Sequence, residues 1–295
     1  MDNYDDLLSN TPTRDADAPQ LSKEEYAAKK KAERDAVFAL SDDTAYDVAA
    51  DGGKLRSFLD LQARLYRYSA ANALLVFARN PGASRLGDFD YWKERNCSVK
   101  PKQTGIAILE PHEYMRDDNT PGTGYDIKKV FDISQVDTRR LRTEPPVRYD
   151  ERQLLGALVS KAPVAVTGAE GLPDGLAAMS DPETGDVLVL KGMGFDDTFR
   201  AVAQELALAG LAASGRTQAD PRFSAHCAAY LLCRKYGADT QAFSFDGAPG
   251  VFEGMDAQGI RGELSQVRDV AEDVSSRMAR QLEAPQKAAR SQDAR

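Results

Sequence analysis

The hydrophobic and polar positions along the chain predict helices that alternate with short strands. Ser22 followed by Glu25 has the spacing of a helix capping box, so we expect a helix to begin there. Lys29, Lys30 and Lys31 fall within this helix, where a solvated helix face explains them as well as a binding role does.

A longer amphipathic helix is predicted between Leu55 and Asn80, where apolar residues recur at about 3.6 positions per turn. The phase of this helix puts Tyr66 on the apolar face and Tyr68 on the opposite face, among arginines. The sequence Asn80-Pro81-Gly82 is expected to end the helix.

Strand patterns follow in two places. The segments 104–109 and 128–133 are predicted strands joined by a hydrophilic loop at 115–124. In the second half we expect a short helix over 154–160, a strand over 163–166, and a hairpin of 176–180 with 187–190. Helices are predicted over 195–214, 221–236 and 258–283. This order of elements predicts an α+β fold in two domains.

The composition places the division between the domains at 141–152, a segment with the proline and charge content of a linker. We expect an α+β domain over 21–140 and a mainly helical domain with a small β-hairpin over 153–283. Residues 1–20 and 284–295 are polar and predict disordered tails, the first of them acidic.

Composition also restricts the class of protein. The 295 residues carry a formal net charge of −8, and no apolar run reaches the roughly 18 residues of a membrane helix. The N-terminus has no signal-peptide pattern. The three cysteines, Cys97, Cys227 and Cys233, are too few for a disulfide framework. These features predict a soluble protein of a reducing cytoplasm that does not enter membranes.

One segment reverses the sign of the charge. Between Lys54 and Lys102, ten lysines and arginines face four acidic residues, a net charge of +6 within an acidic chain. Tyr68, Tyr91 and Trp92 lie among them. Basic side chains bind phosphates, and aromatic faces stack on bases. The segment therefore predicts a surface for single-stranded nucleic acid, with a merely solvated basic face as the alternative.

Several ordered motifs occur in and after this segment. They are Tyr68-Ser69-Ala70-Ala71-Asn72-Ala73-Leu74-Leu75, Pro81-Gly82-Ala83, Trp92-Lys93, the stretch from Lys100 to Gly105, and Val130-Phe131-Asp132-Ile133-Ser134-Gln135. Together they resemble the N-terminal domain of the antirestriction protein ArdC family. The resemblance implies a domain that binds single-stranded DNA, in proteins found on plasmids and conjugative elements.

The charge pattern and the resemblance together predict a set of DNA-binding residues. They are Arg64, Arg67, Tyr68, Asn72, Arg79, Arg85, Trp92, Lys93, Lys100 and Lys102. Two of these residues have an open alternative. Trp92 fits a core position equally well, and Asn72 is suited either to contact a base or to bond a local backbone group.

The second half is similar to the zincin-like metallopeptidase domain of the same family at 199–201 and at 229–237. In that family a helix carries His-Glu-x-x-His, whose histidines bind zinc and whose glutamate is the general base. Here Gln204 and Leu208 stand at the histidine positions, and only Glu205 matches. The third ligand of the family falls near Ser224 or His226.

These replacements predict a catalytically inactive, degenerate domain with a vestigial Glu205. Glutamine is a poor zinc ligand and leucine is none. No P-loop, dinucleotide-binding glycine pattern or nucleophile–histidine pair is evident in the sequence. We therefore expect no catalytic residue, no metal site and no cofactor, although the question of enzymatic activity stays open.

The sequence as a whole predicts a single-stranded DNA-binding accessory protein, antirestriction-like, of a plasmid or conjugative element. Its acidic second half leaves room for a protein partner. Two alternatives stay open. One is a residual zinc-dependent metallopeptidase that holds its metal through Glu205 and His226. The other is a DNA mimic or protein-interaction module.

Overall fold

The structure is a computed structural model that describes residues 22–142 and 147–293. For Asp174 and for 284–293 only the backbone is described. The tail predicted at 1–20 and the centre of the predicted linker, 143–146, lie outside the described residues.

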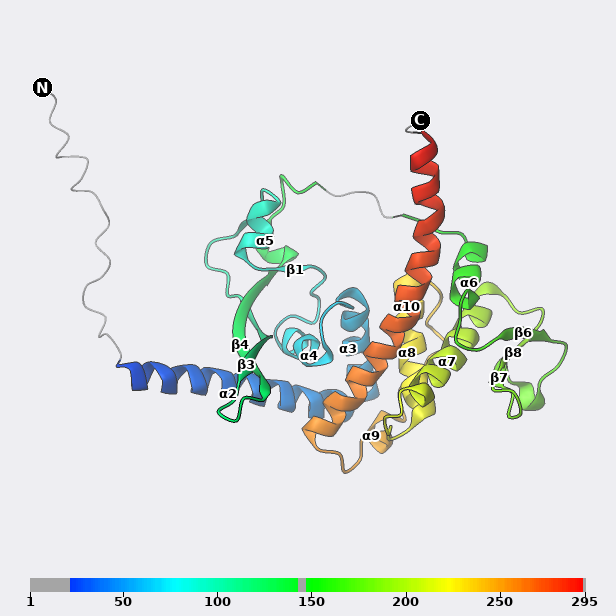
Figure 1. Cartoon of the computed structure of the whole chain (residues 1–295), viewed down its shortest axis with the longest axis horizontal. Helices are drawn as coiled ribbons and strands as arrows, with labels where there is room; N and C mark the ends of the chain where they lie inside the picture. The colour runs from blue at the N-terminus through cyan, green and yellow to red at the C-terminus, as the bar shows by residue number, and fades with distance from the viewer. Residues whose placement is uncertain (1–21, 143–146, 294–295) are drawn as a thin grey trace, which may run out of the picture.

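Helices and a long β-hairpin form the first half of the described chain (Figure 1). The elements are α2 (Lys23–Ala49), α3 (Gly52–Arg64), α4 (Ala70–Arg79), β1 (Leu86–Gly87), α5 (Phe89–Glu94), β2 (Ser98–Val99), β3 (Ile106–Met115), β4 (Pro121–Asp132), the 3-10 turn η1 (Ile133–Gln135) and β5 (Val136–Asp137). The capping box at the start of α2 is confirmed, because Ser22 and Glu25 exchange side-chain to backbone hydrogen bonds of 2.8 and 3.1 Å.

The prediction of one long helix between Leu55 and Asn80 is wrong, because the chain breaks into α3 and α4 at a turn over 65–69. Ser69 caps α4 by accepting a hydrogen bond from the Asn72 amide (3.3 Å). The buried Gln62 donates to the carbonyls of Leu65 (3.3 Å) and Tyr68 (3.1 Å). The apolar spacing continues across the break because both helices pack on the same core.

Strands β3 and β4 form an antiparallel hairpin that is longer than the sequence predicts. Its register runs from Ile106 opposite Val130 to Met115 opposite Pro121. Half of the predicted loop at 115–124 is therefore strand, and only 116–120 form the turn. The outer part of the hairpin is polar and exposed, so it lacks the alternation that identifies a strand with one buried face. Strand β1 pairs with β4 at Leu86 and Asp132 and completes a three-stranded sheet.

The second half contains a small sheet and the longest helices. Its elements are α6 (Glu151–Val159), β6 (Val166–Ala169), the 3-10 turn η2 (Pro173–Gly175), β7 (Ala178–Ser180), β8 (Val187–Leu190), α7 (Phe195–Ala213), α8 (Pro221–Tyr236), α9 (Ala248–Val251) and α10 (Ala257–Asp293). The hairpin of β7 and β8 is confirmed. Strand β6 begins at the end of the segment predicted for it and pairs in parallel with β8. Helix α10 continues from the expected end at 283 to Asp293.

The two halves share one hydrophobic cluster. Helix α3 packs on α8, and α10 packs on α2, α4, α6, α7 and α8 (Figure 1). Polar contacts reinforce this packing, because Asp60 of α3 accepts a hydrogen bond from Tyr230 (2.8 Å) and forms an ion pair with Arg234 (2.7 Å), both of α8. The α+β fold class is confirmed, and the domain division at 141–152 stays a prediction.

A second, smaller core consists of Trp92, Cys97, Phe131 and Val136 and supports the sheet at the end occupied by β1. Within the described ranges, no helix combines the length and the apolar character needed to cross a bilayer.

Candidate nucleic-acid interface

A cleft of about 530 Å³ opens between the α3–α4 turn, the segment of β1 and α5, and the β3–β4 hairpin. Half of the predicted DNA-binding residues line it, namely Arg64, Arg67, Tyr68, Asn72 and Arg85. The cleft exists because the helix breaks at 65–69, which brings a turn carrying Tyr66, Arg67 and Tyr68 to the surface beside the sheet.

Arg64 anchors one edge of the cleft. Its Nε donates to the carbonyl of Ala83 (3.0 Å) and its Nη2 donates to the carbonyl of Pro81 (2.7 Å). These carbonyls belong to the loop after α4, so Arg64 ties that loop to α3. Both acceptors are uncharged, and the guanidinium keeps its full positive charge toward the cleft.

The other two arginines also bond neutral partners. Nε of Arg67 donates to the phenol oxygen of Tyr66 (3.2 Å), and this hydrogen bond raises the pKa of Arg67. Nε of Arg85 donates to the phenol oxygen of Tyr91 (2.9 Å). Neither they nor Arg64 forms an ion pair in the part of the chain that the structure describes. Three uncompensated positive charges therefore surround one cavity.

Lys128 differs from the arginines because two carboxylates compensate its charge. Its Nζ lies 3.1 Å from Asp88 and 3.0 Å from Glu110. These contacts raise the pKa of Lys128, with Glu110 as the main cause. The hydrogen bond from the backbone N–H of Tyr91 is the main cause that lowers the pKa of Asp88, and the hydrogen bond from Lys128 is the second. Lys128 thus connects β4, β3 and the start of α5. Together with its two carboxylates it contributes a net charge of −1, so the four basic and two acidic side chains that line the cleft carry a net charge of +2.

The tyrosines of the cleft differ in how much of each ring is free. The Arg95 guanidinium lies 3.7 Å from the ring centre of Tyr91, and Tyr91 packs so closely on Gly87 that a Cβ there would overlap the ring. Tyr68 has neither a ring contact nor a cation over its face among the described residues. Tyr68 is half-buried, and burial raises the pKa of its hydroxyl, which stays neutral.

Asn72 contacts the backbone of the sheet. Its Nδ2 donates to the carbonyl of Leu109 (2.9 Å), and the Leu109 N–H donates to its Oδ1 (2.8 Å). The amide of Asn72 therefore pairs with the outer edge of β3 as a neighbouring strand would. The side-chain amide therefore bonds a backbone group, as the alternative expects, but that group is distant in sequence and not local; the contact of Asn72 with a base stays a prediction.

Trp92 requires a correction. Its side chain is 0% exposed, and its Nε1 donates to the carbonyl of Phe131 (3.1 Å) in the smaller core. A buried indole with a satisfied N–H has no face for a base. The core alternative is right for Trp92, and its place at the α5 surface is taken by Tyr91, which lines the cleft.

The remaining predicted residues lie outside the cleft. Arg79 lines a separate cleft of about 560 Å³ together with residues of α2 and Lys129. Lys93 is exposed on α5. Lys100 donates to the carbonyl of Ser134 (2.9 Å), and Lys102 is exposed with a left-handed backbone (φ 62°). The structure does not bring these four residues together with the five at the cleft.

Sequence reasoning missed Tyr66, Tyr91 and Lys128 as residues of the cleft. Tyr66 was assigned to the core because the helix was expected to continue through it. Ser69 was the signal for the break, since serine before an apolar run is typical of a helix N-cap. Lys128 had no comparable signal, because its position depends on the pairing of β3 with β4.

Helix α7, for which the sequence predicts a degenerate peptidase motif, has a different polar arrangement. Glu205 is 4% exposed and accepts a hydrogen bond from Ser180 of β7 (2.9 Å). Gln204 bonds Nδ1 of His226 (3.2 Å), whose Nε2 lies 3.1 Å from the carbonyl of Ser244. Burial lowers the pKa of His226 and favours the neutral ring.

These residues do not fit a zinc site. Nδ1 of His226 faces the side-chain oxygen Oε1 of Gln204 and Nε2 faces the carbonyl oxygen of Ser244, so both ring nitrogens already have an oxygen partner. Across the described ranges, no three histidine, cysteine or acidic side chains are grouped as metal ligands. Leu208 stands at the second histidine position on α7 and offers no ligand.

The fold and the cleft define an α+β protein with a basic, tyrosine-lined surface cavity. No family model matches the chain. No curated protein is similar to it at a significant level.

The solved structures that are similar to this chain include two of the antirestriction protein ArdC from plasmid R388. The match to the metal-free structure covers 72% of this chain and 86% of the ArdC chain, with a TM-score of 0.47 and 12% identity. The match to the Mn(II)-bound structure covers 75% of this chain and 98% of the ArdC chain, with a TM-score of 0.48 and 12% identity. A similarity of this size carries no argument for function.

Proposed function

We propose that the chain binds single-stranded DNA in the cleft of about 530 Å³ lined by Arg64, Arg67, Tyr68 and Arg85. The observation that carries the proposal is the state of the three arginines. Each bonds only neutral acceptors within the described residues, so the cleft keeps a positive charge for phosphates.

The ring of Tyr68 supports a single strand over a duplex. A base within a duplex is already stacked on its neighbours, whereas the bases of a single strand are free to stack on a tyrosine. A cleft of about 530 Å³ fits a short stretch of a flexible strand. We further propose that this binding serves an antirestriction-like accessory role of a mobile element in the cytoplasm, on the basis of the sequence motifs at 68–135.

Fluorescence anisotropy with a labelled oligo-dT tests the binding. Tyr68→Ala is expected to lose about 1–3 kcal/mol of stacking, or roughly 5- to 150-fold in affinity, with the salt dependence unchanged. Arg67→Gln is expected to reduce the slope of log K against log salt by about 0.7, the value for one phosphate on a single strand. Lys93→Gln, a basic residue outside the cleft, is the matched control and should bind as the wild type does.

Equal affinity of the Tyr68→Ala variant and the wild type would exclude stacking in this cleft. Equal losses in Lys93→Gln and Arg67→Gln would show a diffuse basic surface instead of a site. Preference for duplex over single-stranded oligonucleotide at the same salt concentration would contradict the proposal as a whole.

A further inference from the structure

Tyr66 lies between the cleft and the helices of the second half. It lines the cleft on one side. On its other side it lines a small cavity together with residues of α3, α8 and α10. The residue is partly buried, and it belongs to the turn at 65–69 that also carries Arg67 and Tyr68. Any movement of Tyr66 therefore moves two residues of the proposed binding site.

Two cationic side chains from the second half contact this residue. Nζ of Lys235, on α8, lies 3.5 Å from the centre of the Tyr66 ring. Nε of Arg268, on α10, donates to the Tyr66 carbonyl (3.2 Å). One contact fixes the ring and the other fixes the backbone of the turn.

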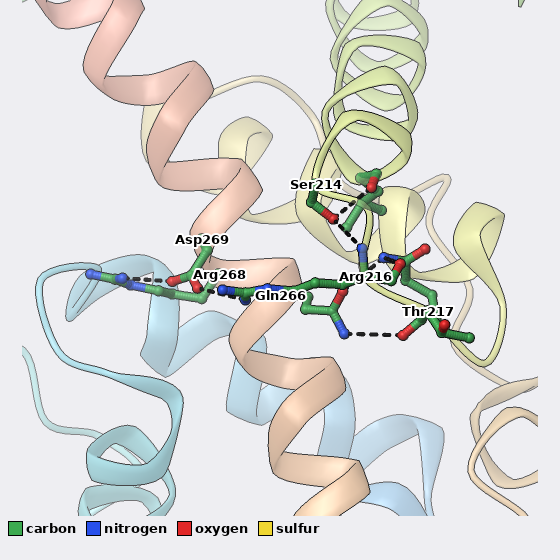
Figure 2. A network of polar contacts seen from close by, with 8 residues as sticks. Ser214, Arg216, Thr217, Gln266, Arg268 and Asp269 are labelled. Atoms are coloured by element: carbon green, nitrogen blue, oxygen red, sulfur yellow. Dashed lines mark hydrogen bonds and ion pairs between the residues drawn. The ribbon is translucent and has the colours of Figure 1, made fainter. Parts of the chain in front are cut away.

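Each of these side chains is itself held in place. Lys235 donates to the hydroxyl of Ser275 on α10. Nη1 of Arg268 bonds Asp269 (2.8 Å), which also faces Arg216 in the loop after α7 (3.8 Å). Figure 2 shows Arg268 and Asp269 next to each other on α10, near the loop that carries Arg216. The contacts thus extend from α8, α10 and the loop after α7 to the turn at the cleft.

We propose that Lys235 and Arg268 are positioning residues for the nucleic-acid cleft, through which the peptidase-like helices set the affinity of the first half for a single strand. The inference rests on the proposed function. Neither side chain lines the cleft, and each reaches it only by its contact with Tyr66, so neither is expected to contact a phosphate. It gives the second half a role that requires no metal and no catalysis.

The test compares three variants of the full chain on α8. Lys235→Met removes the cation from the Tyr66 ring, and we expect about 2- to 5-fold weaker binding of labelled oligo-dT, the effect of one exposed cation–π contact. The salt slope should not change, because no phosphate contact is lost. Lys235→Arg keeps a cation and should restore binding. Arg234→Gln loses the neighbouring link to Asp60, and as the matched control it should bind as the wild type does.

Limited trypsin digestion gives a readout that needs no DNA. Cleavage after Arg67 is expected to be faster in Lys235→Met than in the wild type and Lys235→Arg, because the turn loses a contact. If the wild type binds no oligonucleotide, the proposed function fails, and the cleavage rates still decide whether Lys235 fixes the turn.

Three results would overturn the inference. The first is an affinity and a cleavage rate of Lys235→Met that equal those of the wild type. The second is a salt slope reduced by about 0.7 in Lys235→Met, which indicates a direct phosphate contact. The third is a loss of binding in Arg234→Gln as large as that in Lys235→Met. If Lys235→Met fails to fold, Arg268→Gln supplies the same comparison from α10, with the same expected losses.

Discussion

Replacement of Asn72 by alanine is expected to destabilise the protein and not merely its binding site. Asn72 makes two hydrogen bonds to the backbone of Leu109, at 2.9 and 2.8 Å. Leu109 is 6% exposed, so alanine leaves a buried N–H and a buried carbonyl without their partner. Each such group costs about 1–3 kcal/mol. We therefore expect Asn72→Ala, which leaves two such groups, to lower the free energy of unfolding by about 2–6 kcal/mol.

Urea denaturation followed by tryptophan fluorescence measures this change. Trp92 is the single tryptophan of the chain, and it bonds β4 next to the strand that Asn72 holds. Asn80→Ala is the matched control, because Asn80 makes one local bond to the Gly82 N–H (3.2 Å) and is partly exposed. It should cost about 1 kcal/mol or less.

Two outcomes of these measurements would contradict the structural role of Asn72. If Asn72→Ala unfolds within about 0.5 kcal/mol of the wild type, the pairing with Leu109 contributes nothing measurable. If it also loses affinity for oligo-dT at unchanged stability, Asn72 is a base contact after all.

Three further changes have defined outcomes. Trp92→Phe loses the hydrogen bond to Phe131 and should lower the unfolding free energy by about 1–3 kcal/mol while leaving oligo-dT affinity unchanged. Because this variant lacks the single tryptophan, urea melts followed by circular dichroism measure its stability, and anisotropy measures its affinity. Burial lowers the pKa of His226 below 6.5, so the unfolded chain binds the proton at a higher pH than the folded chain does. The contribution of the neutral ring to the unfolding free energy is therefore present above about pH 6.5 and is lost as the pH falls below it. The urea midpoints of His226→Gln should lack this pH dependence of the wild type. Glu110→Gln removes a negative charge from the cleft beside Lys128 and should tighten oligo-dT binding about 2-fold at low salt, an effect that disappears at high salt.

Local patterns predicted much of the fold. The capping box at Ser22, the β7–β8 hairpin and the helices α7, α8 and α10 follow from residues within a few positions of each other. The break between α3 and α4 does not, because Gln62 holds the turn by bonds to carbonyls that only the folded backbone presents. Because both helices face the same core, the apolar spacing continues across the break, and spacing alone did not predict it.

The candidate site was predicted by region and only partly by residue. Arg64, Arg67 and Arg85, which the reversal of charge in the basic segment indicated, line one cleft in the structure, and their role in binding stays a prediction. Trp92 was misplaced because the phase of the short helix α5 decides which aromatic residue enters the core. Asn72 was ambiguous because its partner, Leu109, is distant in sequence.

The most direct test of the central claim is photocrosslinking of a 5-bromouracil-substituted single-stranded oligonucleotide, followed by tryptic digestion and mass spectrometry. The account predicts crosslinks in the peptide that begins at Tyr68 and ends at Arg79, and their loss in Tyr68→Ala. Crosslinks confined to the lysine-rich part of α2 or to the segment around Lys100 and Lys102, with none in the cleft, would contradict it.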